Sequence, residues 1–329
     1  MTAAPYLLTA KYTPPPTRPR TPVVERQRPT ARLEEPAPLT LVAAPAGFGK
    51  TTLLSAWRAT VVGGALPFAW SMDHAGPMTR TVDDAALLMS VLSQPDARDG
   101  MSLPPADIDW PALDISLKGK RIGLLLDLGF GDRLEDEVRA TVTAAARAFE
   151  SAGASVREVS GVITRETLDG LDAFWRARSW DDLSRMPPDV RAKALPYIYQ
   201  WAEGGAKLSG VDVVRGFNAT MTIRAAAAQL FADLDYVISP VSPVVKFRAE
   251  LAAPRNDPQK PFEHIIYTVP WNMAENPAVS INGGYDNKGF PIGVQIIGRR
   301  FDDLGVLGIA KTFEGLRGPQ RPWPTLPKK

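Results

Sequence analysis

The sequence predicts an α/β fold in which a mixed sheet is flanked by helices, preceded by a short strand–loop–helix fragment near the N-terminus. Short runs of β-branched and apolar residues alternate with longer stretches of helical periodicity, which is the pattern of an α/β domain. Two of the strand-like runs are separated by a single helical stretch, and this order predicts parallel pairing with a right-handed crossover. The 329 residues, 45% of them hydrophobic, are enough to bury a core without disulfides or metals.

Composition excludes several classes of function. The 38 Lys and Arg residues nearly balance the 36 Asp and Glu residues, so the net charge of +2 gives no strong nucleic-acid signal. The absence of Cys excludes disulfides and a cysteine nucleophile, and the two His residues, His74 and His264, are too few for a multi-histidine metal centre. No apolar run is long enough to span a bilayer and no signal segment is visible, so we expect a cytoplasmic protein without membrane contact.

The chain divides by composition into three predicted regions: 1–37, 38–65 and 66–329. The first combines repeated prolines with several Lys and Arg residues. Because proline cannot donate a backbone hydrogen bond and favours extended neighbours, we expect a disordered Pro/Arg-rich leader. A solvated tail is favoured over a nucleic-acid-binding arm.

The second region has the order of a phosphate-binding loop. The strand-like run 39–43 leads into a glycine loop, and an apolar helical start follows. In such a loop, backbone N–H groups surround a phosphate, a lysine reaches the outer phosphates and a hydroxyl ligates magnesium. The predicted nucleotide-binding residues are Gly47, Gly49, Lys50, Thr51 and Thr52.

The stretch 11–60 resembles the start of the P-loop ATPase domain in large LuxR-like transcription regulators of the maltose-regulator type. The resemblance implies binding of ATP and magnesium, and it also implies a later strand that ends in an acidic pair. The best candidate strand ends at Asp127, where Leu128 stands in place of a second acid. The alternative is a phosphate loop separated from its sheet. We therefore expect ATP and magnesium only if the loop is functional, and otherwise no cofactor.

The third region begins with a predicted helix and two predicted strands. Thr81 is the expected N-cap of the helix, which ends before Pro95. The apolar run 122–127 is a buried strand, and 156–159 is a second, shorter strand.

A helix is predicted between these two strands. Asp132 and Glu135 have the spacing of a capping box at its start, and Gly153 marks its end. One face is apolar at helical spacing and is formed by Leu134, Val138, Val142, Ala145 and Phe149. The three elements together form a predicted βαβ unit.

Residues 164–235 are predicted to be helical, with helices over 164–180 and 189–202 and a third from Ser209. One stripe of the third helix is lined by Val211, Val214, Phe217, Met221, Ala225, Ala228 and Phe231.

The C-terminal part supplies three further predicted strands and a helix. The strands are 236–240, 277–281 and 291–298, with a turn at 286–289. Two adjacent acids, at 302 and 303, open the final helix.

Other combinations of reactive side chains are weaker evidence for an active site. Asp73 and His74 are adjacent, as are Glu263 and His264, so in neither pair are the two side chains placed as a catalytic triad requires. The acid pairs Asp83–Asp84, Asp181–Asp182 and Asp302–Asp303 are interpreted as helix starts rather than glycosidase carboxylates. For the aromatic residues of the helical region, core packing is favoured over a substrate pocket; these are Trp175, Trp180, Tyr197, Tyr199 and Trp201.

Four segments resemble the amidase signature family, in the family's order. They are FAWSMDHAGPMTRTVDDAALLMSVL at 68–92, LKGKRIGLLLDLGFG at 117–131, PWNMAENPAVSINGGYDNKGFPIGVQIIGRRFDD at 270–303 and RPWP at 321–324. The likeness covers residues 66–329. It implies a layered α/β fold with a central mixed sheet, and hydrolysis of carboxylic amides through an acyl-enzyme. In the family, a Lys activates the nucleophilic Ser through a second Ser on a cis peptide, and backbone N–H groups form the oxyanion hole.

The family's catalytic residues are transferred to no position of this chain. The sequence contains neither a Gly-Gly-Ser nor a Ser-Ser pair, and stepping about 30 residues back from Asp73 leads to Ala43, inside the glycine loop. A second departure is Glu275, which places a charge where the family has a small glycine-rich turn near the expected acyl pocket.

The expected function is therefore that of an amide C–N hydrolase homologue that lacks the Ser–cisSer–Lys half and is inactive alone, and whether it is an enzyme stays open. Two alternatives stay open as well. One is an ATP-binding regulatory fragment that uses the glycine loop. The other is a non-enzymatic fusion remnant. The expected partners are a small-molecule amide and either a homo-oligomer or a partner chain that covers the incomplete sheet.

Overall fold

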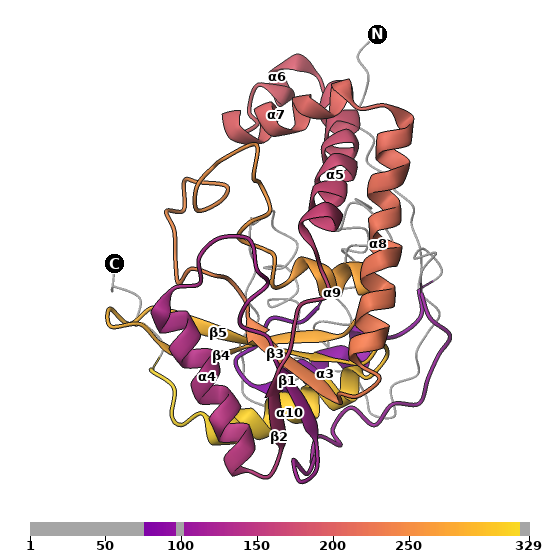
Figure 1. The fold of residues 1–329 in the computed structure, drawn as a ribbon. Helices are drawn as coiled ribbons and strands as arrows, with labels where there is room; N and C mark the ends of the chain where they lie inside the picture. The colour runs from indigo at the N-terminus through magenta and orange to yellow at the C-terminus, as the bar shows by residue number, and fades with distance from the viewer. Residues whose placement is uncertain (1–75, 97–101, 323–329) are drawn as a thin grey trace, which may run out of the picture. The chain divides into compact units, whose positions relative to one another are not determined.

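A computed structural model of the chain describes residues 76–96 and 102–322 (Figure 1). The chain divides into two units, Met1–Phe68 and Ala69–Lys329, and every described residue belongs to the second. The predicted leader 1–37, the glycine loop with its five nucleotide-binding residues, and the Asp73–His74 pair all lie outside the described residues.

The described part contains a five-stranded mixed sheet, which confirms the predicted fold class. The strands are β1 (Arg121–Leu124), β2 (Ser155–Glu158), β3 (Tyr236–Pro240), β4 (Ala278–Tyr285) and β5 (Pro291–Gly298). Their order is β2-β1-β3-β5-β4. Strand β1 pairs in parallel with both β2 and β3, while β5 pairs antiparallel with β3 and β4. The predicted parallel pairing of the βαβ unit is thus confirmed.

The strand predictions differ from the structure mainly in length. Both 236–240 and 291–298 are strands over the predicted residues. Strand β4 extends beyond its predicted end at residue 281 because it forms a hairpin with β5 that includes a register shift between Asn282 and Gly284. The predicted turn closes this hairpin: Gly289 N donates to Asp286 O, and Gly289 has a φ of 89°.

Helix α4 (Asp136–Ser151) connects β1 and β2. Its predicted apolar face is buried, including Val142 and Phe149. The predicted capping box is wrong: Glu135 is the N-cap without a side-chain cap bond, and Asp132 lies outside the helix. The reason is tertiary, since Glu135 Oε2 instead accepts a hydrogen bond from Val245 N, at 2.9 Å.

A helical region follows β2 and consists of α5 (Arg165–Arg185), α6 (Pro188–Arg191), α7 (Pro196–Glu203), the 3-10 turn η1 (Gly204–Lys207) and α8 (Gly210–Leu230). Thr164 and Ser209 cap α5 and α8 through capping boxes, at the residues where the first and third helices are predicted to begin. Helix α5 is longer than predicted. The predicted helix 189–202 is two helices, because Pro196 starts α7 and its predecessor Leu195 is extended.

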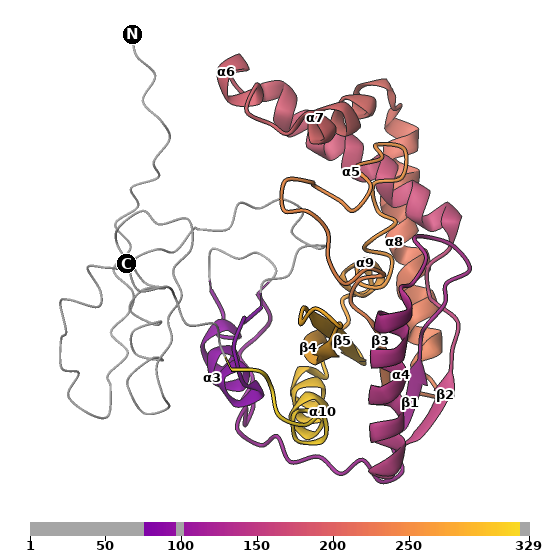
Figure 2. The ribbon, with the colours of Figure 1, turned by 90° about the vertical axis from the view of Figure 1, so that its left-hand side faces the viewer.

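Most of the apolar stripe predicted on α8 lies on the exposed side of the helix, whereas Phe231 at its end is buried. Val211 is 58% exposed, Phe217 42% and Met221 57%. The buried face is instead formed by Gly216, Ala219, Thr220, Ile223 and Ala227. Helices α5 and α8 lie side by side (Figures 1 and 2), and the backbones approach so closely that a Cβ on Gly216 would lie 2.3 Å from Gly170 O. Packing therefore selects the face with small residues over the face with large ones.

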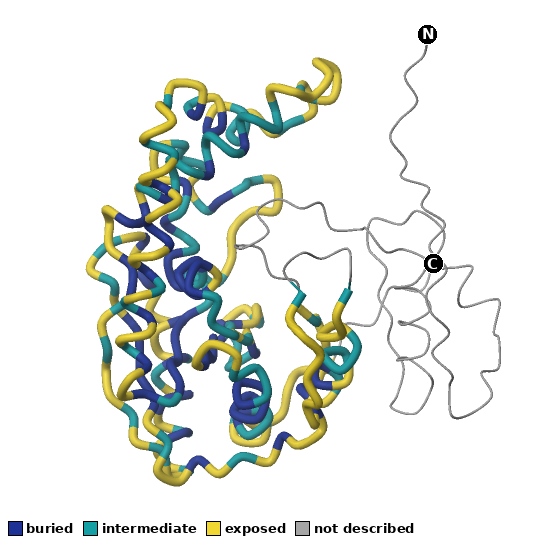
Figure 3. Tube along the Cα trace, turned by 90° about the vertical axis from the view of Figure 1, so that its right-hand side faces the viewer, coloured by how far each residue is buried: buried dark blue, intermediate teal, exposed yellow. Residues whose placement is uncertain are grey.

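Three more helices complete the described part: α3 (Val82–Leu92), α9 (Val269–Ala274) and α10 (Asp303–Leu316). Thr81 caps α3, as predicted. Helices α4 and α10 meet on one face of the sheet, where the Phe149 and Phe313 rings are 5.3 Å apart. Buried residues concentrate in the sheet and the elements packed on it (Figure 3). Within the described ranges, no helix combines the length and the apolar character needed to cross a bilayer.

Candidate functional site

The parallel strands β1, β2 and β3 end at one edge of the sheet. The chain leaves β1 through α4 to reach β2 on one side, and it later returns to place β3 on the other side of β1. The strand order therefore reverses between β1 and β3. In open α/β sheets, ligands bind in the crevice between the loops that leave the strands at such a switch point. In this chain those loops are 125–135 and 241–268.

The two loops line an open hollow of about 640 Å³, which we call the switch-point hollow. Loop 125–135 and the first residue of α4 contribute Asp132, Arg133, Glu135 and Asp136. Loop 241–268 contributes the cations Lys246, Arg248 and Arg255 and the apolar side chains Val244, Phe247, Leu251 and Pro254. The hollow therefore combines both signs of charge with an apolar wall.

Asp132 is the most deeply placed of the charged groups that line the hollow, with a side chain only 7% exposed. The Arg255 Nε atom lies 2.9 Å from Asp132 Oδ1, and the Arg255 side chain is 64% exposed. Although this distance makes an ion pair, its geometry is not that of a hydrogen bond, and Oδ1 accepts no hydrogen bond from any described residue. A buried carboxylate oxygen without a donor is unusual, because desolvation of such an atom is costly.

The two loops are tied together next to Asp132. Glu135 N donates to Pro243 O at 2.9 Å, and Glu135 Oε2 accepts from Val245 N. The phenol of Tyr267 donates to Leu126 O at 3.0 Å. Burial raises the pKa of Tyr267 to about 12, so this phenol stays protonated and remains a donor at neutral pH.

A second tie joins loop 241–268 to the β4–β5 turn. Lys246 pairs with the buried carboxylate of Asp286, and its ammonium group lies 3.8 Å from the centroid of the Phe290 ring. The hydrogen bond from Lys246 lowers the pKa of Asp286. The ammonium group of Lys246 is thereby held at the wall of the hollow.

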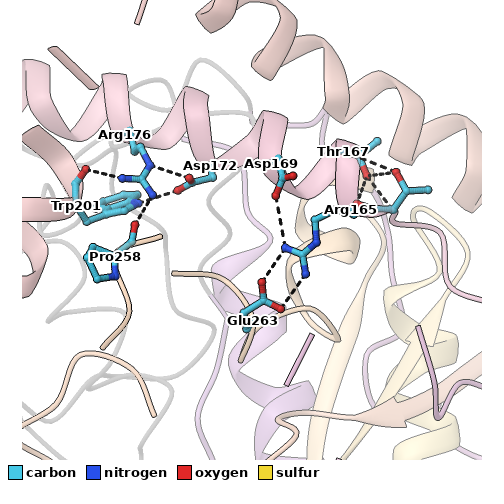
Figure 4. Close-up of polar contacts among 9 residues, drawn as sticks. Arg165, Thr167, Asp169, Asp172, Arg176, Trp201, Pro258 and Glu263 are labelled. Carbon is cyan, nitrogen blue, oxygen red and sulfur yellow. Dashed lines mark hydrogen bonds and ion pairs between the residues drawn. The ribbon is translucent and has the colours of Figure 1, made fainter. Parts of the chain in front are cut away.

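Helix α5 anchors the far end of loop 241–268 through a forked ion pair (Figure 4). Arg165 donates to the two carboxylate oxygens of Glu263 at 2.7 and 3.0 Å, and its guanidinium lies 4.8 Å from the centroid of the Phe130 ring. The hydrogen bond with Glu263 raises the pKa of Arg165.

A second network, further along α5, holds the same loop (Figure 4). Asp172 accepts from Arg176 Nε and from Trp201 Nε1, both at 2.7 Å, while Arg176 also donates to Trp201 O and Pro258 O. Burial raises the pKa of Asp172. In both networks, each charged group is paired with another group of the protein. The networks therefore position the loop and do not present a reactive side chain.

The sequence predicts that His264 and Glu263 do not form a catalytic triad, and the structure agrees. Glu263 is engaged by Arg165, and the His264 ring makes an edge contact with Phe247, with ring centroids 6.3 Å apart. Burial lowers the pKa of His264 more than Asp132 raises it, so the imidazole is neutral at pH 7.

The other singled-out side chains are structural in the described part. Asp83 lies in the first turn of α3 and Asp302 caps α10, as predicted. The prediction for Asp181 and Asp182 is wrong: they lie inside α5, where they pair with Arg185 and Arg178 one turn away. The five aromatic residues belong to α5 and α7, and none lines the switch-point hollow; Trp175 and Trp201 are buried, and Trp180 meets Tyr199 edge-on at 6.0 Å.

Glu275 ends α9 in the left-handed region, with a φ of 58°. Non-glycine residues rarely adopt this backbone conformation. The Glu275 carboxylate pairs with Arg224 of α8 and with Arg300, so the charge predicted at this position is neutralised within the chain.

Sequence reasoning misses the residues of the switch-point hollow. Asp132 and Glu135 stand out in the sequence, but their spacing matches a capping box. The high density of charged residues in 246–257 is a further signal for this site, but apolar periodicity does not detect it. Among the described residues, no cluster of three or more His, Asp or Glu side chains is arranged to hold a metal ion.

A mixed sheet with a ligand-sized hollow at its switch point is typical of ligand-binding α/β proteins. The family described as Amidase matches residues 51–307, and the chain belongs to this family. Similar proteins include the A-subunit of the glutamyl-tRNA(Gln) amidotransferase of Myxococcus xanthus, 32% identical over 276 residues covering 76% of this chain and 56% of the relative. The same subunit from Brevibacillus brevis is 31% identical over 283 residues, covering 78% and 56%.

Solved structures agree with this assignment. A bacterial aryl acylamidase of the amidase signature family superposes with a TM-score of 0.64 at 27% identity, covering 73% of this chain and 52% of that one. The glutamyl-tRNA(Gln) amidotransferase A-subunit of Thermotoga maritima shares the fold, with a TM-score of 0.59 at 24% identity over 75% of this chain and 53% of the other.

The chain spans about half the length of the curated relatives it matches. The family match begins at residue 51, inside the glycine loop, and not at residue 66 as the four segments predict. Thr51 and Thr52 therefore belong to the matched region, although the glycine-loop pattern predicts that they bind nucleotide.

Proposed function

We propose that the chain supplies the C-terminal part of an active site that hydrolyses the C–N bond of small carboxylic amides, and that it does not turn over amides alone. The observation that carries this proposal is the family match over 51–307, combined with the lack of any Ser-Ser or Gly-Gly-Ser pair in the 329 residues. A serine at its ordinary pKa is a poor nucleophile without a neighbouring base and fixed oxyanion donors. The names of the relatives, an aryl acylamidase and an amidotransferase subunit, support an amide as the substrate class.

The test uses the purified 329-residue chain with simple amides, and it measures the release of ammonia or arylamine. A fluorophosphonate probe that labels activated serines provides a second readout by intact-mass spectrometry. We expect no product above buffer and no added mass. Product formation that disappears with a single Ser→Ala replacement would contradict inactivity and would identify the nucleophile. Labelling of one serine without turnover would also contradict the proposal, because it would reveal an activated hydroxyl.

Binding of ATP is a second candidate function. The spacing of Gly47, Gly49 and Lys50 after the run 39–43 favours it. If it is correct, ATP with magnesium raises the melting temperature of the chain and Lys50→Ala abolishes the increase, because a ligand stabilises the folded state that binds it. An unchanged melting temperature in saturating ATP excludes this function.

We also propose that a second polypeptide, either another copy or a separate partner chain, covers strand β4. Within the described residues, β4 pairs only with β5 and is an edge of the sheet, and exposed edges favour association. Sedimentation of the purified chain tests this proposal. A stable monomer that shows no tendency to associate as concentration rises would contradict the homo-oligomer.

A further inference from the structure

We propose that the switch-point hollow binds a small zwitterion, a molecule with a primary ammonium group and a carboxylate a few bonds apart. This role is additional to amide hydrolysis and does not rest on it, because all the residues that carry it lie in the described structure. Such a ligand places its ammonium group on Asp132 and its carboxylate among the guanidinium groups at the rim.

Asp132 is the residue from which we infer a ligand. Its carboxylate is more than nine-tenths buried, it lines the hollow, and its Oδ1 atom accepts no hydrogen bond from the described protein. An ammonium group supplies three N–H donors, which give this atom the hydrogen bond that it lacks, and a positive charge that replaces that of Arg255.

The other charges of the hollow exclude ligands with a single charge. Four cations line the hollow together with three carboxylates. A simple cation that reaches Asp132 meets the repulsion of the cations around it, and a simple anion leaves the Asp132 oxygen unsatisfied in a more negative surrounding. A molecule with both charges avoids both costs.

The guanidinium groups at the rim are free to turn toward a carboxylate. The Arg255 side chain is 64% exposed, and that of Arg248 is 79% exposed with a contact of 3.4 Å to Glu250. When an ammonium group takes the Asp132 oxygen, Arg255 is released to bind the carboxylate of the same ligand through its fork of N–H donors. Val244 and Phe247 form an apolar wall for the connecting carbon atoms.

The first experiment titrates the full 329-residue chain, by calorimetry, with glycine, β-alanine and γ-aminobutyrate. Methylammonium and acetate are the single-charge controls. We expect saturable binding of at least one zwitterion with a Kd of about 1 mM or below, and no saturable binding of either control. Absence of binding by all three zwitterions overturns the proposal, and so does equal binding of a control.

The second experiment compares Asp132→Asn with Asp189→Asn. Both replacements remove one carboxylate charge, but Asp189 lies on α6, exposed and outside the hollow. We expect Asp132→Asn to weaken zwitterion binding by about tenfold or more, because a charged hydrogen bond is lost, and Asp189→Asn to leave it within about twofold. Equal affinities of the two variants overturn the proposal.

A third variant, Arg255→Ala, tests the same site even if Asp132→Asn does not fold. Because the Arg255 side chain is mostly exposed, its truncation leaves no buried cavity. Zwitterion affinity should fall by about tenfold, while methylammonium should now bind, because Asp132 has lost its ion-pair partner. A variant that keeps its affinity for the zwitterion and still does not bind methylammonium contradicts the proposed roles of both residues.

Discussion

Glu263 illustrates how a single residue acquires its role. In the sequence it is one half of a Glu–His neighbour pair, and its chemistry there is ambiguous. In the fold its carboxylate is 7% exposed and is held by the guanidinium of Arg165, which lies 98 positions earlier in the chain. Burial of this charge is tolerated because two hydrogen bonds of the fork replace its hydration. The pair therefore ties loop 241–268 to α5.

The two acidic partners of Arg165 allow a matched test. Glu263→Gln should lower the free energy of unfolding by about 1–3 kcal/mol, because it breaks a charged hydrogen-bond pair at a buried position. Asp169→Asn removes the other partner, which is 64% exposed at 3.4 Å, and should cost less than about 0.5 kcal/mol. Urea unfolding at neutral pH measures both. Similar losses in the two variants would show that burial does not decide the strength of these pairs.

Among the secondary-structure elements, α8 shows the difference between predicting a helix and predicting its face. The predicted start of the helix at Ser209 is confirmed, because Ser209 is its N-cap and forms a capping box with Asp212. The apolar stripe predicts the wrong face, because α5 presents Gly170 and requires a small residue opposite. Hydrophobicity patterns measure the preference for burial, whereas close helix contacts are decided by side-chain volume.

Replacement of glycine by alanine at two positions of α8 tests this account. Gly216→Ala should destabilise the protein by about 1–3 kcal/mol, because the added methyl group overlaps the α5 backbone. Gly210→Ala is the control, since no atom lies within 4 Å of the added Cβ. Its stability should stay equal or rise by less than about 1 kcal/mol, because alanine favours a helix. Thermal or urea unfolding distinguishes them, and equal stability of the variants would mean that the α5–α8 contact is looser than described.

Across the described unit as a whole, the Lys246–Asp286 pair joins the loop after β3 to the β4–β5 turn. These segments are 40 positions apart in sequence and meet at the wall of the switch-point hollow. Asp286 also accepts backbone N–H bonds from Lys288 and Phe290, which shape the turn. One carboxylate therefore organises a hairpin and holds a cation at a candidate ligand site.

This arrangement predicts a specific dependence of stability on pH. Because Lys246 lowers the pKa of Asp286 below its ordinary value of 3.8, the carboxylate stabilises the folded state above that pH. The stabilisation is lost as the pH falls through the lower, folded-state value. Asp286→Asn should therefore unfold at lower urea concentration than wild type at about pH 7, and the difference should shrink below about pH 4. Asp136→Asn, at a side chain 82% exposed, is the control and should show little difference at either pH. A constant difference for Asp286→Asn would contradict this coupling.

Local patterns in the chain are sufficient for the α/β class, the strands 236–240 and 291–298, the cap at Thr81, the helix starts near 164 and 209, and membership of the amidase family. Each of these depends on local hydrogen bonding, on the period of apolar residues or on ordered motifs, and all three are present in a linear chain. The buried face of α8, the positions of the carboxylates of Asp132 and Glu263 and the cations that they meet emerge only in the folded structure. Those outcomes depend on volume and charge brought together from distant segments, and no local pattern contains that information.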